Sequence, residues 1–532
     1  CIGRYIYVDE QNGSDSCAGT VDDPLKSFAG AKNKVAQLLS QECKENIYVI
    51  FRDGDYFIEE PLVFDSGDGS KDLKICYMAE NAGKSVITGG KQVSGFQMYD
   101  EPSGIYRAYV GKNVMSRQFF VNGIRAVRAK SAGVLRDAVN IGHGITTSDL
   151  SLLKYQNISD LELVFYEKWT NPRCSVESIR QDGNKAVLSM KQPAWNYVTG
   201  KGTTSATIPV WYENAYELID EGGEWYLDSE EGYIYYKPRE GENLDQAKCI
   251  LPITEKLMIM TNSVSQIYTD KNIQFKGLAF SYTTWNYPTT TGGLSDAQNN
   301  LLRELGSGLD GDRLCDGAIE INYSGNIRFE DCTFSKLGII GIKLTEGAKK
   351  IDIIGCEFSD ISGSAIAVGE SSTSNKDYYN PSSSRQYVSD ININNNCIYS
   401  VGVEYQSSSA ISVGFPKNCI ISHNEIYDIP YSGIHVGLGW GSLESSGSYG
   451  IEITDNYIHN IMNSKLYDGG AIYTNGLTGA SVEDMNKICR NYIQNQKMST
   501  GAIYNDEGSS FWQVSENVID LSENSIWIMR NS

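Results

Sequence analysis

A small set of polar and aromatic residues near the end of the sequence has types and spacing suited to binding or chemistry. Tyr473 and Tyr504 occupy equivalent positions in two aligned segments, and each is followed two residues later by a polar residue, Asn475 or Asp506. His435 holds the equivalent position one segment earlier. Carboxylate, amide and imidazole groups accept or donate hydrogen bonds and carry protons, and aromatic faces suit sugar rings. The structural alternative is a solvated strand face with stacked tyrosines.

The segments that carry these residues recur in register along the chain. Each is a small residue followed by Ile, and the step from Glu320 to Lys343 is 23 residues. Seven segments align without gaps, starting at Ala318, Gly341, Ala365, Ala410, Gly433, Ala471 and Ala502, and an eighth is placed at Ser525. The position after each Ile is expected to point outward, and it gives the column Glu320, Lys343, Ala367, Ser412, His435, Tyr473, Tyr504 and Trp527.

Apolar ladders lie between these segments. One ladder is Phe329, Ile353, Ile393, Ile421, Ile453, Ile488 and Val514, and a second is Phe334, Phe358, Ile398, Ile426, Ile458, Ile493 and Ile519. Between them runs a column of Cys332, Cys356, Asn396, Asn424, Asn456, Asn491 and Asn517. Parallel strands stacked about 4.8 Å apart place like residues of successive coils on top of one another. The pattern predicts an all-β, right-handed parallel β-helix.

The earlier part of the chain adds two features to this solenoid. Residues 27–39 have one apolar helical face, which predicts a helix that caps the N-terminal end. Residues 121–124 and 225–236 are predicted to form β-hairpins within an inserted antiparallel β module. We therefore expect three parts: 1–94, the cap and first coils; 95–250, the inserted module; and 251–532, the main β-helix with a substrate groove.

Insertions in the late coils favour a groove beside the tyrosine column. The longest are residues 371–389 and 438–449, and loops that flank one strand column form the walls of a groove. Trp440 lies in the second of these insertions and Trp285 in an earlier long loop, residues 281–315. Both are candidates for stacking on a sugar, although at least one of them is expected to cover the base of a loop instead. His435 is a candidate for a hydrogen bond to a sugar hydroxyl, and a structural role is the alternative.

Composition narrows the range of partners. The net charge is -21 and the pI is near 4.7, which disfavours nucleic acid and anionic lipid. No apolar run is long enough to span a membrane. The 12 cysteines follow neither a metal-ligand spacing nor a disulfide framework. We expect no metal or cofactor; Asp310, Asp312 and Asp316 could hold a structural Ca²⁺, but a solvated acidic loop is favoured.

Several motifs carry a resemblance to a known family. These are residues 431–440 (YSGIHVGLGW), 468–475 (DGGAIYTN) and 503–510 (IYNDEGSS), together with 8–15, 119–125 and 223–228. They resemble bacterial β-helix glycoside hydrolases, most closely glycoside hydrolase family 141, with the family 136 lacto-N-biosidases and the family 120 β-xylosidases as related possibilities. The resemblance implies a secreted or cell-surface bacterial enzyme that acts on oligo- or polysaccharides as a fucosidase, a xylan-active enzyme or a lacto-N-biosidase-like enzyme. The chain begins at Cys1 without an apolar leader, so we expect that an export signal has been removed or the chain trimmed.

The same resemblance implies the catalytic residues. The two aspartates proposed for family 141 match Asp468 and Asp506 here, and Glu507 is a further candidate for the acid. Glycosidic cleavage requires one carboxylic acid that protonates the leaving oxygen and one carboxylate that attacks carbon or activates water. His435, Trp440, Tyr473, Asn475, Tyr504 and Trp285 are the expected substrate-binding residues.

Two other functions are compatible with a β-helix. A polysaccharide lyase needs a Lys or Arg base, for which Lys343 is the candidate on the outward column, but the negative net charge suits polyuronates poorly. A non-catalytic glycan-binding protein is the second alternative, because a fold does not fix a function.

Overall fold

The computed structural model describes residues 3–135, 137–262, 269–299, 301–303, 312–371, 376–440, 444–497, 500–520 and 526–530. The chain divides into two compact units. Unit 1 consists of Cys1–Gly89, Lys256–Ser281 and Arg313–Ser532, and unit 2 of Gly90–Glu255 and Tyr282–Asp312. The division made from the sequence places residues 282–312 in the main β-helix, whereas in the structure they belong with unit 2.

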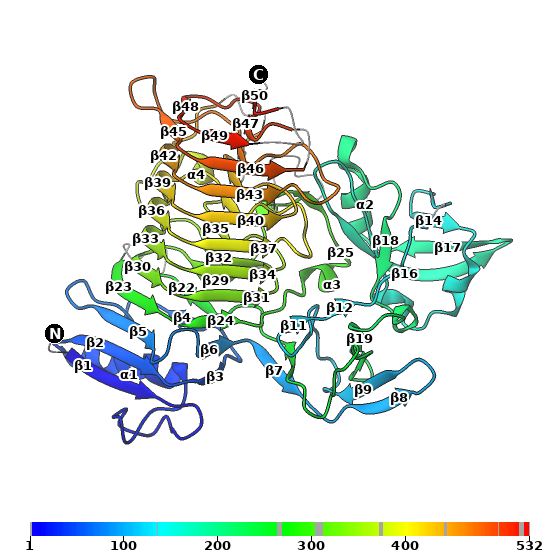
Figure 1. Ribbon diagram of the computed structural model, residues 1–532, viewed down its shortest axis with the longest axis horizontal. Helices are drawn as coiled ribbons and strands as arrows, with labels where there is room; N and C mark the ends of the chain where they lie inside the picture. Colours follow the sequence, from blue (N-terminus) through cyan, green and yellow to red (C-terminus); the bar gives the residue numbers. More distant parts are fainter. Residues whose placement is uncertain are drawn as a thin grey trace. The chain divides into compact units, whose positions relative to one another are not determined.

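Unit 1 is a parallel β-helix, and the predicted fold class is confirmed (Figure 1). Its coils contribute strands to three parallel sheets. The first sheet contains, in spatial order, β1 (Gly3–Val8), β2 (Asn46–Phe51), β5 (Ile75–Ala79), β23 (Thr269–Lys276), β30 (Ser324–Glu330), β33 (Lys349–Ile354), β36 (Ser389–Asn394), β39 (Lys417–Ser422), β42 (Tyr449–Thr454), β45 (Asn486–Cys489) and β48 (Trp512–Ser515).

The other two sheets follow the same order of coils. The second sheet contains β3 (Gly54–Phe57), β6 (Ser85–Thr88), β24 (Ala279–Ser281), β31 (Thr333–Leu337), β34 (Glu357–Ile361), β37 (Cys397–Val401), β40 (Glu425–Ile429), β43 (Tyr457–Ile461), β46 (Tyr492–Gln496) and β49 (Val518–Asp520). The third sheet contains β4 (Leu62–Phe64), β22 (Met258–Met260), β29 (Gly317–Ile321), β32 (Ile340–Leu344), β35 (Ile366–Val368), β38 (Ile411–Val413), β41 (Ile434–Val436), β44 (Ile472–Thr474), β47 (Ile503–Asn505) and β50 (Ile528–Arg530). The short elements β28 (Arg313–Leu314) and α4 (Lys376–Tyr379) also belong to unit 1.

The predicted apolar ladders fill the core of the β-helix. Ile421 pairs with Ile453, which pairs with Ile488, and all three side chains are fully buried. The pairing also extends the first ladder toward the N-terminus, from Phe329 through Phe275 to Tyr77. Stacked like residues pack without voids because successive coils repeat the same shape.

The predicted asparagine column forms a ladder of side-chain hydrogen bonds. The Oδ1 atom of Asn456 accepts from both the backbone N–H and the Nδ2 of Asn424, at 3.0 and 2.9 Å. The Nδ2 of Asn456 also donates to the carbonyl of Ile421 at 2.9 Å, and Asn491 repeats the pattern on the next coil. Each buried turn therefore has its polar groups satisfied by the adjacent coil.

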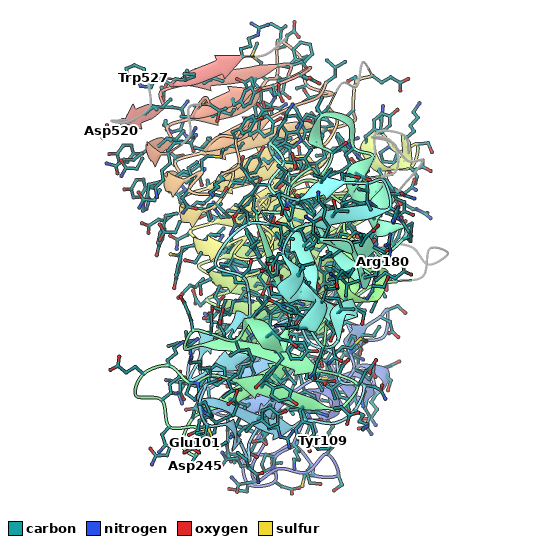
Figure 2. All side chains as sticks on the ribbon, turned by 90° about the vertical axis from the view of Figure 1, so that its right-hand side faces the viewer. Glu101, Tyr109, Arg180, Asp245, Asp520 and Trp527 are labelled. Carbon is teal, nitrogen blue, oxygen red and sulfur yellow. The ribbon has the colours of Figure 1, made fainter. Side chains whose placement is uncertain are left out.

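The eighth strand was predicted with the wrong alignment. The structure pairs Tyr504 with Met529, not with Trp527. Side chains alternate with a period of two, so a shift of two residues keeps the apolar pattern and leaves the error invisible in the sequence. Trp527 is 59% exposed and lies with Asp520 near the C-terminal end of unit 1 (Figure 2).

The predicted N-terminal helix is present as α1 (Phe28–Ser40). Ser27 is its N-cap and accepts a hydrogen bond from the backbone N–H of Gly30 at 2.9 Å. Phe28 is buried against the rings of Phe51, Phe64 and Tyr77, which come from the first coils. The helix thus covers the end of the core.

Unit 2 is mainly antiparallel. One of its sheets contains β7 (Gly90–Val93), β21 (Cys249–Pro252), β10 (Phe120–Val121) and β11 (Ile124–Arg125). Another contains β8 (Gln97–Asp100), β9 (Ile105–Tyr109), β20 (Tyr233–Tyr236), β19 (Glu224–Asp228) and β12 (Val127–Arg128). A further sheet contains β13 (Val139–Asn140), β14 (Gly144–Thr147), β17 (Lys185–Met190), β16 (Arg173–Asp182), β15 (Glu162–Val164) and β18 (Trp211–Glu213), with β25 (Gly293–Leu294) paired to β16. It also contains β26 (Asp296–Gln298), β27 (Leu301–Leu302), α2 (Ala194–Thr199), α3 (Tyr287–Thr291) and the 3-10 turns η1 (Leu150–Lys154), η2 (Ile158–Asp160), η3 (Gly202–Thr204) and η4 (Tyr216–Leu218).

Both hairpins predicted for this unit are present. Val121 pairs with Ile124 around a turn in which Asn122 and Gly123 both have positive φ, and Trp225 pairs with Tyr236. The segment 282–312 joins the unit because β25 pairs with β16 and because the Lys201 Nζ donates to the carbonyl of Asp296 at 2.5 Å.

The core ladder leads to a stability prediction. Replacing Ile453 with Asp places a carboxylate between two fully buried isoleucines, so its cost should exceed the roughly 2–5 kcal/mol of a large-to-Ala core change. We expect the variant to be insoluble or to show no cooperative thermal transition, whereas Glu452→Asp, on the solvent side of the same strand, should melt normally. Circular dichroism melting checks this, and a soluble Ile453→Asp protein with an unchanged transition would contradict the ladder.

Candidate functional site

A column of residues immediately after the strands of the third sheet forms one edge of the β-helix. Each of these residues donates its backbone N–H to a carbonyl of the preceding coil, so their spacing is fixed by the stacking. We call this set the strand-end column: Thr261, Asn322, Thr345, Gly369, Gly414, Gly437, Asn475 and Asp506. Asn475 and Asp506 are the two members of this column that the sequence analysis singled out.

The aromatic part of the candidate site comes from three adjacent strands. His435 on β41 pairs with Tyr473 on β44, which pairs with Tyr504 on β47. The His435 and Tyr473 rings are tilted with centroids 4.4 Å apart, and the Tyr473 and Tyr504 rings stack with centroids 4.9 Å apart. The sequence places these residues on an outward surface, but they are only 0, 1 and 2% exposed, so the column is not a solvated face.

Tyr504 connects the two candidate catalytic aspartates. Its hydroxyl oxygen lies 3.0 Å from Asp468 Oδ1 and 3.1 Å from Asp506 Oδ1. Asp506 is 5% exposed, whereas Asp468 is partly exposed. Burial beside these two carboxylates raises the pKa of Tyr504, so it stays protonated as a hydrogen-bond donor.

A bend in the chain brings Asp468 to this cluster. Asp468 precedes its strand and has a left-handed backbone with φ of 67°. The Tyr431 hydroxyl donates to the Asp468 carbonyl at 2.7 Å, and the backbone N–H of Gly470 donates to Ser432 Oγ at 3.2 Å. A Cβ on Gly469 would lie 2.5 Å from the same Ser432 oxygen, so only glycine fits there.

Trp440 and Tyr473 continue the hydrogen-bonded chain on the other side of Asp506. The indole Nε1 of Trp440 donates to the Tyr473 hydroxyl at 2.8 Å, and that hydroxyl donates a short hydrogen bond to Asp506 Oδ2. An indole N–H can only donate, so the Tyr473 oxygen accepts and its own proton points to Asp506. Burial raises the pKa of Tyr473 well above its usual value, which keeps this proton in place.

His435 and Asn475 form a buried pair next to Tyr473. The backbone N–H of Gly439 donates to Asn475 Oδ1 at 3.0 Å, which orients the amide so that its Nδ2 donates to His435 Nε2 at 2.7 Å. This pattern fixes the tautomer with the proton on Nδ1. Burial lowers the pKa of His435 to about 3, so the ring is neutral at physiological pH.

Glu507 and Trp285, the other two predicted residues, have different local surroundings. Glu507 follows Asp506, but its side chain is exposed, and its backbone carbonyl accepts from Gly476. Trp285 belongs to unit 2, where it is 1% exposed and stacks on Tyr287 with centroids 5.3 Å apart. His435, Trp440, Tyr473, Asn475 and Tyr504 do lie together with Asp468 and Asp506.

Tyr431 and Ser432 are positioning residues that sequence reasoning did not identify. Both stand at the start of the motif YSGIHVGLGW, directly before an aligned segment. Their role depends on contact with residues 468–470, which lie on the next coil and are distant in the sequence. Their position directly before an aligned segment, from which a polar side chain can reach the following coil, is the sequence signal that could have indicated them.

The acidic loop expected as a calcium candidate is only partly described. Asp310 lies outside the described residues, and the Asp312 carboxylate forms a bidentate ion pair with Arg303 at 2.9–3.0 Å. Asp316 Oδ1 lies 3.4 Å from Lys256 Nζ. Over the part of the chain that the structure describes, no group of three or more His, Cys, Asp or Glu residues is arranged to hold a metal ion.

No helix among the described residues is both long and apolar enough to cross a bilayer.

Comparisons with known proteins bear on the family. Residues 107–239 match the model of the GH141 insertion domain, so the resemblance to family 141 is confirmed in this segment. Over the whole chain, a solved structure described as a glycoside hydrolase superposes with a TM-score of 0.84 at 22% identity, covering 99% of this chain and 97% of that one. This match shows a shared fold.

Two other solved structures are more distant. XylC in complex with xylose has a TM-score of 0.46 at 13% identity and covers 96% of this chain and 70% of that chain. The GH136 lacto-N-biosidase from Eubacterium ramulus has a TM-score of 0.38 at 12% identity, with coverages of 98% and 68%. No curated protein matches the sequence.

The buried His435 predicts a pH dependence of stability. Its pKa is about 3 in the folded chain and about 6.5 in the unfolded chain, so the unfolded state binds the extra proton between these values. Stability should therefore fall as the pH falls below 6.5, by on the order of 2 kcal/mol between pH 7 and pH 4.5 from this group. The variant His435→Gln should lose that part of the pH dependence in urea unfolding.

The matched control for this measurement is Thr333→Ser, which changes a partly exposed side chain without a titratable group on the second sheet. It should leave the difference in unfolding free energy between pH 7 and pH 4.5 as in the unchanged protein. Equal pH dependence in His435→Gln and the unchanged protein would contradict the buried neutral ring.

Proposed function

We propose that this chain, which carries the insertion domain of glycoside hydrolase family 141, is a glycoside hydrolase with Asp468 and Asp506 as its catalytic pair. The observation that carries the proposal is the contact of one hydroxyl, that of Tyr504, with both carboxyl groups. Two carboxyl groups facing one another across a small gap are the arrangement that glycosidic cleavage requires. The whole-chain likeness to a glycoside hydrolase supports the same function.

The contacts of Tyr504 favour retention of anomeric configuration. Its hydroxyl oxygen lies about 3 Å from both Oδ1 atoms, so these two oxygens are no more than about 6 Å apart and the hydroxyl occupies the space between them. Retaining enzymes hold their carboxyl groups about 5–5.5 Å apart, whereas inverting enzymes need about 6.5–9.5 Å to admit a water molecule. We infer a double displacement through a covalent glycosyl-enzyme intermediate.

The hydrogen bonds favour different roles for the two aspartates. Asp506 accepts a hydrogen bond from the Tyr473 hydroxyl at Oδ2 and can accept one from the Tyr504 hydroxyl at Oδ1. Tyr504 has only one proton, so when it donates to Asp506, a hydrogen bond with Asp468 requires a proton on Asp468. Asp468 is then the acid and Asp506 the nucleophile.

The reaction follows from these roles. Asp468 protonates the glycosidic oxygen while Asp506 attacks the anomeric carbon and the leaving alcohol departs. Asp468, now ionised, removes a proton from water, which attacks the anomeric carbon and releases Asp506 as a carboxylate. Trp440, partly exposed and held by Tyr473, is placed to contact the sugar.

The substrate that we propose is an uncharged oligo- or polysaccharide, of the fucosylated, xylan or lacto-N-biose type. The net charge of -21 disfavours anionic glycans. A lyase reaction is less well supported because Lys343, the basic residue on the outward column, lies three coils before His435, and its Nζ is 3.6 Å from Glu370. We further propose a secreted or cell-surface bacterial location, which rests on the family resemblance.

Substitution of the pair tests the reaction. Asp468→Asn and Asp506→Asn keep shape but remove the titratable group, so each should fold and bind substrate while losing several orders of magnitude in rate. A broad panel of uncharged oligosaccharides, read out by chromatography, identifies the substrate first. Glu507→Gln, an acidic neighbour with an exposed side chain, is the matched control and should keep near-normal turnover.

The leaving group separates the two roles. Asp468→Asn should recover much of its rate on aryl glycosides whose phenols leave without protonation, whereas Asp506→Asn should not. Proton NMR of the first product formed should show the anomer of the substrate. Inverted product would rule out Asp506 as the nucleophile, and near-normal turnover of either variant on the identified substrate would remove that residue from the pair.

Trp440 has two functions that two substitutions can separate. Trp440→Phe keeps an aromatic face but loses the hydrogen bond to Tyr473, and a hydrogen bond of about 1 kcal/mol corresponds to a several-fold fall in kcat with little change in KM. Trp440→Ala should also raise KM while leaving Tm nearly unchanged. A fall in Tm with unaltered KM would instead assign Trp440 a purely structural role.

A further inference from the structure

A cavity of about 280 Å³ lies on the strand-end column, several coils before the catalytic cluster. Its walls carry amides, hydroxyls, carboxylates and two phenol rings. They are Thr261, Asn322, Thr345, Tyr323, Glu346 and, from the segment around α4, Tyr378, with Asn262 and Glu370. All of these residues belong to unit 1.

The cavity and the catalytic cluster share one edge of the β-helix. From Thr345 the column rises through Gly369, Gly414, Gly437 and Asn475 to Asp506, which is five coils. At about 4.8 Å per coil, the cavity lies about 24 Å from Asp506. A smaller hollow lined by Gly369 and Phe415 shares Glu346, Glu370 and Tyr378 with it and extends it toward the cluster.

The cavity is held in shape by its own contacts. The Tyr323 hydroxyl donates to Glu346 Oε2 at 2.5 Å, and Asn262 Nδ2 donates to the Tyr323 carbonyl at 2.8 Å. Thr261 Oγ1 donates to Asn322 Oδ1. Glu370 is 3.6 Å from Lys343. These contacts order the walls before any ligand arrives, which lowers the entropic cost of binding.

Several polar atoms in these walls are left for a ligand. Within the described residues, Asn322 Nδ2, the Thr345 hydroxyl and Glu346 Oε1 make no hydrogen bond. One amide donor, one hydroxyl and one carboxylate acceptor next to an aromatic ring are the groups that bind the hydroxyls and the apolar face of a sugar. Glu346, Glu370 and the adjacent Asp377 would repel an anionic sugar.

We propose that this cavity is a distal binding site for an uncharged polysaccharide, separate from the catalytic cluster and aligned with it along the strand-end column. The proposal of a common substrate chain rests on the proposed function; binding at the cavity does not. A chain long enough to fill both places would be anchored about five coils from the bond that is cleaved. A disaccharide is too short to reach both.

The first experiment measures binding without turnover. Affinity electrophoresis of Asp506→Asn in gels containing soluble xylan, glucomannan or fucosylated xyloglucan should show retardation by at least one of them. Adding Asn322→Ala and Tyr378→Ala should weaken that retardation at least tenfold in the apparent Kd. The matched control adds Tyr492→Ala, a tyrosine 38% exposed on the second sheet, and should bind as before.

The second experiment compares long and short substrates in the active protein. Asn322→Ala/Tyr378→Ala should raise KM at least tenfold for the polysaccharide that is bound, with kcat/KM for the shortest cleaved oligosaccharide unchanged. Equal losses on long and short substrates, or no retardation by any of the three polysaccharides, would overturn the distal site. Binding that depends on the cavity without turnover of any glycan would overturn the proposed function and leave the distal site supported.

A metal ion is the competing occupant of a cavity with two glutamates. Under that alternative, Ca²⁺ raises Tm in the unchanged protein but not in Glu346→Gln/Glu370→Gln, and polysaccharide retardation is absent or independent of Asn322 and Tyr378. That result would overturn the proposal. Retardation by alginate or polygalacturonate equal to that by uncharged polysaccharides would also contradict it, because the carboxylates of the cavity should exclude them.

Discussion

Everything in unit 1 depends on the vertical register between successive coils. A parallel strand pairs with the coil before and the coil after through evenly spaced backbone hydrogen bonds, so a residue's height along the axis is fixed by its position in the repeat. The asparagine ladder adds a second set of hydrogen bonds, between side chains, that can form only when successive coils are in register. Because of this register, residues far apart in sequence, such as Tyr504 and His435, are held at fixed spacing without any local loop to position them.

The candidate site uses this register and departs from it at one place. Tyr473, Tyr504 and Asp506 lie at the positions that the repeat predicts. The rings of the two tyrosines stack because adjacent coils hold them at that spacing. Asp468 is brought in by a left-handed residue and two glycines whose neighbours leave no room for a side chain. The pair of carboxyl groups therefore combines one residue fixed at the end of a strand with one on a turn that other side chains hold in place.

The parts of the structure that repeat could be predicted from the sequence, and the parts that depend on tertiary context could not. The ladders through Ile453 and the asparagine column repeat often enough to exclude other folds, and Asn122–Gly123 identified its hairpin through a local turn preference. The end strand was misaligned by two residues because its alternating pattern fits either alignment. The burial of His435 and the position of Trp285 depend on what packs over them, which a strand pattern does not encode. The catalytic pair came from family motifs, since nothing in the spacing placed Asp468 beside Tyr504.

The point at which unit 2 interrupts unit 1 has a consequence for how the chain folds. β5 and β23 are adjacent in the first sheet, with Ile75 paired to Ile273, although almost two hundred residues separate them in the sequence. β6 and β24 are likewise joined through Val86 and Ala279. Contacts between such distant segments carry a high entropic cost of loop closure and slow the folding of a domain. During synthesis, the first coils expose an unpaired strand edge until residues near 275 have emerged. Folding of the inserted unit by itself would shorten the effective loop and bring the two edges together.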